Sequence, residues 1–262
     1  MPLYKRREDD GGGTAAPSGP PPTSALPPLP ERRPVLIVLH QEKSTPARIG
    51  RWFHEAGFPL DIRRPRFGDQ LPETLDDHAA AVIFGGPMSA NDPDDYIRRE
   101  TDWIDVPLRE DRPFLGICLG AQMLARKLGA TVAPSPQGAI EVGYYPLTVT
   151  PAGRVLAPWP EKVYQWHTEG FTMPDGAVRL AGTELYPNQA MSYGRAAAAV
   201  QFHPEITYAL VNRWTSSRPD RLVTTGARPR DEHFENHMLH TAAVGRWIDA
   251  FLTRLLRAEL TV

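Results

Sequence analysis

The chain contains a single cysteine among its 262 residues. One thiol cannot build an internal disulfide framework or a cysteine-cluster metal site, so we expect neither. Charge of one sign is also lacking, because 29 Lys and Arg stand against 31 Asp and Glu. A chain this close to neutral offers no surface-wide basic field, so neither nucleic acid nor a membrane is an expected partner. Apolar runs long enough to cross a bilayer are absent from the sequence.

The first 33 residues have the composition of a disordered tail. Gly, Pro, Ser, Thr and Ala dominate residues 11–34, and such a segment cannot bury enough apolar surface to order itself. A polyproline segment that binds a partner is the alternative interpretation. Three basic residues at 5–7 are followed by acidic residues and glycines, where a secretory signal would need an apolar stretch. We therefore expect a cytoplasmic protein with a tail over 1–33 and one folded domain over 34–262.

Short apolar runs recur in the first half of the predicted domain. The runs at 35–39, 80–84 and 113–117 are apolar on both faces, which is typical of central parallel strands covered by helices. Segments with helical spacing alternate with them. This alternation predicts an α/β fold with a doubly wound, mostly parallel sheet flanked by helices. Several short strands between residues 142 and 202 predict a small antiparallel edge.

Helix start and stop signals accompany these segments. Thr45 and Pro46 predict the cap and first turn of a helix that ends at Gly57. A last helix is predicted over 234–256, with an apolar stripe that packs on the sheet. The stripe consists of Leu239, Ala243, Trp247, Phe251 and Leu255. The Arg- and Ser-rich stretch 214–230 before it is predicted to be a surface loop.

The one thiol lies in the sequence Gly-Ile-Cys-Leu-Gly at 116–120, between a predicted strand and a predicted helix. The two glycines permit a sharp turn that presents the sulfur above the sheet edge. At a helix N-terminus the macrodipole and the free N–H groups favour the thiolate, and the N–H of Leu119 points to where an oxyanion would form. An inert buried cysteine is the alternative, which the flanking glycines disfavour. We therefore predict that Cys118 is a nucleophile.

A second motif, Gln-Phe-His-Pro-Glu, occupies 201–205 at the end of another predicted strand. Proline at 204 disfavours helix at His203, so we expect an extended backbone on which side chains two apart share a face. Glu205 can then orient the His203 ring and support its charged form. Glycines 85 and 86 follow a strand as well, and either let a backbone N–H approach a substrate or form a plain turn.

In this order the motifs resemble the GGP, G-x-C-x-G-x-Q and H-P-E signatures of the class I (triad) glutamine amidotransferases. The similarity spans residues 35–258. It is closest to the stand-alone, GMP-synthase-like subgroup, because segments 165–171 and 188–190 are also similar. The resemblance implies the flavodoxin-like fold of that family.

The same resemblance implies a role for each matching residue. The implied triad is Cys118, His203 and Glu205. The N–H groups of Gly86 and Leu119 would form the oxyanion hole, and Gln122 would contact bound glutamine. The subgroup's usual W-H-G-D loop differs here, since Thr168 and Glu169 stand in its last two positions. Whether His167 and Glu169 bind substrate or have structural roles stays open.

The implied reaction is hydrolysis of the glutamine side-chain amide through a γ-glutamyl thioester on Cys118, without metal or organic cofactor. The sequence has no Ser-Gly-Gly-x-Asp-Ser nucleotide loop and no P-loop, so we expect a separate synthetase to accept the ammonia. A free-standing hydrolase of γ-glutamyl peptides or amides is the second hypothesis. A non-catalytic regulatory or binding domain on the same fold is the third, and the intact Cys, His and Glu argue against it. The expected ligand is L-glutamine or a γ-glutamyl compound.

Overall fold

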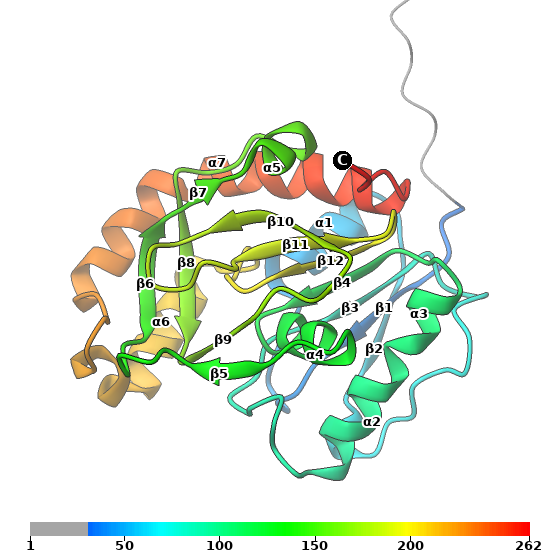
Figure 1. Ribbon diagram of the computed structural model, residues 1–262, viewed down its shortest axis with the longest axis horizontal. Helices are drawn as coiled ribbons and strands as arrows, with labels where there is room; N and C mark the ends of the chain where they lie inside the picture. Colours follow the sequence, from blue (N-terminus) through cyan, green and yellow to red (C-terminus); the bar gives the residue numbers. More distant parts are fainter. Residues whose placement is uncertain (1–30) are drawn as a thin grey trace, which may run out of the picture.

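The computed structural model of the protein describes residues 31–262 (Figure 1). Most of the predicted tail therefore lies outside the described residues. The strands are β1 (Val35–Val38), β2 (Leu60–Arg63), β3 (Ala80–Ile83), β4 (Phe114–Ile117), β5 (Val132–Pro134), β6 (Glu141–Pro146), β7 (Thr148–Val149), β8 (Lys162–His167), β9 (Glu169–Phe171), β10 (Ala177–Gly182), β11 (Ala190–Tyr193) and β12 (Ala197–Val200). The helices are α1 (Ala47–Glu55), η1 (Pro65–Phe67), α2 (Asp95–Trp103), α3 (Asp105–Arg109), α4 (Leu119–Lys127), α5 (Pro151–Leu156), α6 (Tyr208–Ser217), η2 (Pro219–Val223) and α7 (Arg230–Leu256).

One eight-stranded sheet organises the fold, in the order β2-β1-β3-β4-β12-β11-β10-β7. Neighbours from β2 through β12 pair in parallel, and those from β12 to β7 pair antiparallel. Two further two-stranded sheets are present: β5-β9 packs against α4, and β6-β8 packs against α7. The predicted doubly wound, mostly parallel sheet with a small antiparallel edge is confirmed. Its parallel strands follow the flavodoxin-like order, with β1 between β2 and β3.

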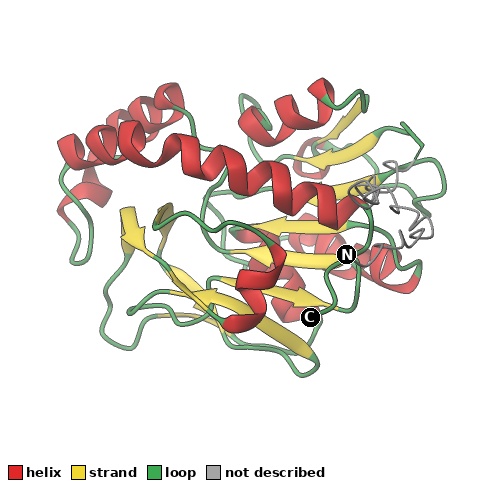
Figure 2. Ribbon diagram, turned by 90° about the horizontal axis from the view of Figure 1, so that it is seen from above, coloured by secondary structure: helices red, strands yellow, loops and turns green. Residues whose placement is uncertain are grey.

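Helices cover both faces of the parallel part of the sheet, as Figure 2 shows for the long helix α7 on one side. Alternate residues of β1 pack into the hydrophobic cores on the two faces of the sheet, because successive side chains of a strand point to opposite faces. Val35 and Ile37 join a core with α1 and α7, whereas Leu36 and Val38 join a core with α2, α3 and α4. All four side chains are fully buried, which explains why the strand is apolar on both faces.

The predicted Thr45 cap of the first helix is wrong. Pro46 occupies the N-cap position of α1, and no side chain caps the helix. The Pro46 carbonyl accepts a hydrogen bond from the Gly50 N–H at 3.0 Å, so the helix begins one residue later than predicted. The other end agrees with the sequence, because Gly57 follows α1 with a φ of 87°.

The predicted stripe of the last helix is wrong at its first member. Leu239 is 74% exposed, whereas Trp247, Phe251 and Leu255 are buried. Residues four apart drift by roughly 40° per step on a helix of 3.6 residues per turn, so a stripe with constant spacing of four leaves the buried face. The segment 214–230 is also more helical than the predicted loop, since it contains the end of α6 and all of η2. Among the described residues, no helix is long and apolar enough to span a membrane.

Candidate active site

Cys118 lies at a strained turn between β4 and α4. Its φ of 51° and ψ of -102° lie outside the regions that non-glycine residues prefer. The turn requires both flanking glycines. A Cβ at Gly116 would lie 2.4 Å from the carbonyl oxygen of Gly120, and a Cβ at Gly120 would lie 2.2 Å from that of Ile83. The sulfur-bearing residue thus stands at the N-terminus of α4, where partial positive charge favours an anion.

His203 and Glu205 follow β12 and form a close pair. His203 Nδ1 donates to Glu205 Oε1 at 2.7 Å, and both side chains are buried. The predicted extended backbone is wrong here, because residues 203–206 form a turn in which the Ile206 N–H donates to the His203 carbonyl at 3.3 Å. The turn, rather than a shared strand face, brings the carboxylate to the imidazole.

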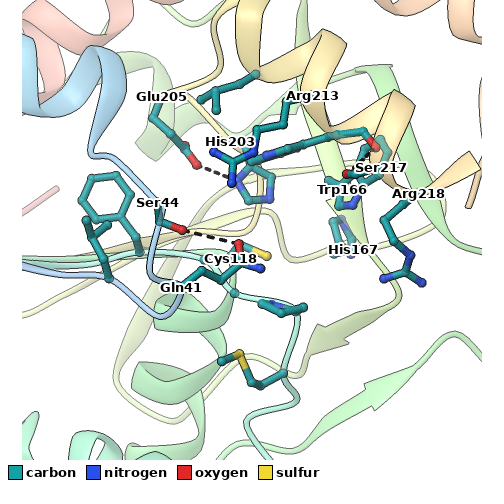
Figure 3. Close-up of a pocket in the computed structure, with 18 of the residues that line it drawn as sticks. Gln41, Ser44, Cys118, Trp166, His167, His203, Glu205, Arg213, Ser217 and Arg218 are labelled. Atoms are coloured by element: carbon teal, nitrogen blue, oxygen red, sulfur yellow. Dashed lines mark hydrogen bonds and ion pairs between the residues drawn. The ribbon is translucent and has the colours of Figure 1, made fainter. Parts of the chain in front are cut away.

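Sheet topology brings this pair to Cys118. Strands β4 and β12 are parallel neighbours, so their carboxyl ends meet at one edge, and the Cys118 N–H donates to the Val200 carbonyl at 2.8 Å. The end of β3 reaches the same point. A Cβ at Gly85 would lie 2.9 Å from His203 Cε1 and 3.2 Å from the Cys118 Cβ. Figure 3 shows the His203 ring between Glu205 and Cys118.

The environment of His203 favours its charged form. Burial alone would lower its pKa, but the Glu205 carboxylate and Cys118 outweigh burial and raise the pKa to about 10. The other ring nitrogen, Nε2, is buried and has no hydrogen-bond partner in the described part of the chain. Trp214 of α6 packs its ring edge-on to the imidazole, with 4.8 Å between centroids. Glu205 and Trp214 therefore fix the His203 ring, and Nε2 is the ring nitrogen that can exchange a proton with a ligand.

A second buried histidine–carboxylate pair lies behind the glycines that follow β3. His40 Nε2 is 2.7 Å from Glu100 Oε2, and both side chains are completely buried. His40 Nδ1 donates to the carbonyl oxygen of Gly85 at 3.2 Å, since a carbonyl oxygen can only accept. That carbonyl belongs to the same peptide unit as the N–H of Gly86. The pair therefore fixes the direction in which the Gly86 N–H points.

Two backbone donors remain available beside the thiol. Within the described residues, neither the Gly86 N–H nor the Leu119 N–H donates to a protein acceptor. Leu119 is the first residue of α4, where N–H groups have no partner inside the helix. Such unpaired donors are the groups from which an oxyanion hole is built.

Sequence reasoning did not identify His40 and Glu100. A weak signal existed for each residue. His40 comes two residues after the apolar strand β1, and Glu100 stands between Ile97 and Trp103 on the buried face of α2. A carboxylate on an otherwise apolar helix face indicates a partner, although the sequence does not say which one.

The structure brings together the three residues considered for substrate binding: Gln122, His167 and Glu169. Gln122 Nε2 donates to the Glu169 carbonyl at 3.0 Å, and His167 Nδ1 donates to the same oxygen at 2.9 Å. The other nitrogen of His167 lies 3.1 Å from Glu141 Oε2 in a buried network. Among the described residues none donates a hydrogen bond to the Glu169 carboxylate, which lines the cavity. Gln122 and His167 therefore hold the backbone that presents Glu169.

A cavity of about 410 Å³ opens above the thiol. Cys118, His203 and Gly86 line it together with side chains of β8, β9 and α6. Three arginines also line it: Arg213 of α6, Arg221 of η2 and Arg218 between these two helices. Within residues 31–262 no group of three His, Cys, Asp or Glu side chains is arranged to hold a metal ion.

A buried thiol beside a histidine–carboxylate pair, at the carboxyl edge of a parallel sheet, is an arrangement suited to acyl transfer through cysteine. The family described as glutamine amidotransferase class-I matches residues 38–211, and the chain belongs to this family. YfeJ, a glutamine amidotransferase-like protein of Salmonella typhimurium, is 32% identical over 187 residues, which cover 68% of this chain and 77% of YfeJ.

Other relatives differ in how much of their length they share with this chain. The glutamine-hydrolyzing GMP synthase of Aeropyrum pernix is 32% identical over 63% of this chain, but the match spans only 31% of the synthase. Two solved structures agree over most of the fold. A glutamine amidotransferase from Methylobacillus flagellatus has a TM-score of 0.79 at 25% identity, covering 87% of this chain and 95% of that chain. One from Thermotoga maritima has a TM-score of 0.77 at 27% identity, covering 86% and 98%.

Proposed function

We propose that the protein hydrolyses the side-chain amide of glutamine through a γ-glutamyl thioester on Cys118. The observation that carries the proposal is the strained turn that places this thiol at a helix N-terminus beside the His203–Glu205 pair. Family membership supports glutamine amide hydrolysis as the reaction class. The role of each residue follows from its contacts.

In the first step, the Cys118 thiolate attacks the γ-carbonyl carbon of glutamine and a tetrahedral intermediate forms. Its oxyanion would accept hydrogen bonds from the N–H groups of Gly86 and Leu119. The imidazolium of His203 then gives its Nε2 proton to the amide nitrogen, the C–N bond breaks and ammonia leaves. Because Glu205 holds Nδ1, the free nitrogen of His203 is the one that transfers the proton.

In the second step, His203 accepts a proton from water at Nε2 while the water oxygen attacks the thioester carbon. The C–S bond breaks, glutamate leaves and the thiolate of Cys118 is restored beside the imidazolium. The same two backbone donors would stabilise the second oxyanion. Loss of one such donor typically lowers kcat by about 10²- to 10³-fold, so the orientation of the peptide between Gly85 and Gly86 matters to both steps.

Glu169 is proposed to bind the α-ammonium group of the substrate, because its carboxylate faces the cavity without a hydrogen-bond donor from the described residues. Gln122 and His167 act through the backbone at this position, since both donate to the Glu169 carbonyl. A separate synthetase is proposed to accept the ammonia. The GMP synthases that this chain resembles over about a third of their length support this assignment, since these relatives combine glutamine hydrolysis with a synthase.

Hydrolysis of γ-glutamyl peptides or amides is a second candidate function. It is favoured by the size of the cavity, which continues from Cys118 to side chains of α6 and η2 and leaves room for a leaving group larger than ammonia. The chemistry at Cys118 and His203 would be the same, with an amine in place of ammonia.

The direct test is glutamate release from L-glutamine by the purified protein, in parallel with a panel of γ-glutamyl peptides. We expect turnover that disappears in Cys118→Ala, whose unfolding temperature should stay close to that of the wild type because only one sulfur atom at the wall of an existing cavity is removed. Glutamine turnover supports the amidotransferase function. Cleavage of γ-glutamyl peptides that depends on Cys118, with little glutamine turnover, supports the hydrolase.

If no substrate is turned over, alone or with candidate acceptor enzymes added, the catalytic proposal fails. The protein would then act as a binding or regulatory domain on this fold.

A further inference from the structure

The wall of the cavity formed by α6 and η2 is not accounted for by the chemistry at Cys118. We call residues 208–223 the arginine segment. It contributes Arg213, Arg218 and Arg221 to the cavity lining, and all three lie beyond residues 38–211, which match the family. Figure 3 shows Arg213 and Arg218 around the cavity that holds Cys118. The three arginines therefore lie outside the stretch that the family match covers.

Arg221 is the central observation. Its side chain is half-buried, and no described carboxylate or carbonyl oxygen accepts a hydrogen bond from its guanidinium. Burial lowers its pKa, and the neighbouring charge of Arg218 lowers it further. A guanidinium partly removed from water without a bonded anion is energetically unfavourable, and a bound anion would relieve this cost.

The two neighbouring arginines have protein partners of their own. Arg218 forms a two-bond ion pair with Asp220, at 2.9 and 2.7 Å, which occupies the one nearby carboxylate of the segment. Arg213 donates to the Lys43 carbonyl at 3.1 Å and so bridges to the loop before α1. Three arginines against one aspartate leave an excess of two positive charges on this wall. All three arginines line the cavity that Cys118 also lines.

We propose that Arg221, supported by Arg218 and Arg213, binds a carboxylate of the acyl substrate while the substrate's γ-carbonyl lies at Cys118. This inference rests on the proposed acyl-transfer function and specifies its substrate class. A planar guanidinium matches a carboxylate with two parallel hydrogen bonds. The carboxylate has two sources, the α-carboxylate of the glutamyl group or a carboxylate on the leaving amine of a γ-glutamyl peptide.

Four substrates separate these sources. Glutamine and γ-glutamyl methylamide carry only the α-carboxylate, γ-glutamylglycine carries a second carboxylate on the leaving amine, and 4-aminobutanamide carries none. The variants are Arg221→Gln, Arg221→Lys and the control Arg246→Gln, an exposed arginine of α7 outside the cavity. Charge-assisted hydrogen bonds of this kind change kcat/KM by about 10- to 100-fold.

We expect Arg221→Gln to lose that factor for carboxylate-bearing substrates, Arg221→Lys to recover part of it and Arg246→Gln to match the wild type. Equal losses for glutamine, γ-glutamyl methylamide and γ-glutamylglycine assign the α-carboxylate. A loss confined to γ-glutamylglycine assigns the leaving amine. Activity on 4-aminobutanamide should not change. Wild-type kcat/KM of Arg221→Gln on all three carboxylate-bearing substrates would overturn the proposal.

A binding measurement keeps this inference separate from the proposed function. If the wild type turns over none of the substrates, the catalytic proposal fails but the carboxylate site can still be tested by calorimetry with glutarate. Binding of glutarate that weakens at least tenfold in Arg221→Gln and not in Arg246→Gln supports the site. Equal binding by all three proteins, or by none, argues against it.

Discussion

Replacing His40 by leucine removes the side chain that holds the peptide between Gly85 and Gly86. In the wild type the imidazole bridges the Gly85 carbonyl at 3.2 Å and the Glu100 carboxylate at 2.7 Å. The proposed oxyanion donor, the Gly86 N–H, lies in that same peptide unit. Without His40 the peptide loses its orienting donor, while Cys118, His203 and Glu205 keep all their contacts.

The cost in stability depends on what remains of the pair. In His40→Leu the Glu100 carboxylate is left completely buried without its partner, which typically costs about 3 to 5 kcal/mol of unfolding free energy. In the double variant His40→Leu/Glu100→Leu both polar groups are replaced by apolar side chains, and such replacements are often neutral or stabilising by about 1 to 4 kcal/mol. The double variant should therefore recover the stability that the single variant loses.

Activity should not recover with stability. Complete removal of an oxyanion donor costs about 10²- to 10³-fold in kcat, and a donor that is present but no longer held should cost less, about 10- to 100-fold. The assay is glutaminase kcat for the wild type and the double variant, beside the rate of Cys118 alkylation by iodoacetamide. Alkylation attacks a saturated carbon and forms no oxyanion, so its rate should be unchanged.

Wild-type kcat in the double variant would refute the reasoning, because the peptide would then be oriented without His40. A parallel fall in alkylation and hydrolysis would also count against it, since general damage to the site would explain both. His40→Asn is the conservative variant. Its side-chain amide nitrogen can stand near the position of Nδ1, so it should retain more activity than leucine at this position.

Three further outcomes follow from the same structure. Gly120→Ala should destabilise the fold by about 1 to 3 kcal/mol or more in chemical denaturation, because the added Cβ would lie 2.2 Å from the Ile83 carbonyl oxygen; a neutral effect would mean that this turn can relax. His203 has a pKa raised to about 10, so its stabilising contribution is complete below the unfolded-state pKa of about 6.5 and is lost as pH rises through 10. Denaturation of the wild type and His203→Gln from pH 6 to pH 10.5 should therefore show a difference that declines by at most about 1.4 kcal/mol per pH unit, and a pH-independent difference would contradict the raised pKa. Trp247→Ala should cost about 3 to 5 kcal/mol and Leu239→Ala less than about 0.5 in thermal denaturation, and a loss of about 2 kcal/mol or more for Leu239→Ala would mean that Leu239 is packed as the predicted stripe requires.

Local patterns in the sequence were enough to predict the sheet and to choose the residues proposed for catalysis. Apolar runs such as 80–84 determine a strand through its own side chains, and glycines at 116 and 120 constrain the turn at Cys118 from within five residues. The H-P-E motif places His203 and Glu205 side by side whether the backbone is extended or turned. This is why the pair was predicted although the backbone between them was not.

The features that could not be predicted from the sequence depend on contacts between segments that are far apart in the chain. His40 and Glu100 are 60 residues apart, and only the packing of α2 against the sheet brings them together. The abundance of Arg and Ser after Trp214 predicts a loop at this residue, yet Trp214 lies in α6 and packs against His203. The predicted burial of Leu239 is wrong for a geometric reason. Residues spaced by four stay on one face of a helix for only a few turns, and the predicted stripe extends beyond that length.

The two hydrogen bonds to the Glu169 carbonyl have a consequence for ligand affinity. Gln122 reaches this oxygen from α4 and His167 reaches it from the end of β8, so the β8–β9 connection is fastened from two directions before any ligand arrives. A ligand that meets the Glu169 carboxylate then has to immobilise only a side chain, and the conformational entropy of the backbone has already been lost on folding. The protein can therefore recognise a small polar molecule with few contacts, because little of the binding free energy is consumed in ordering the loop.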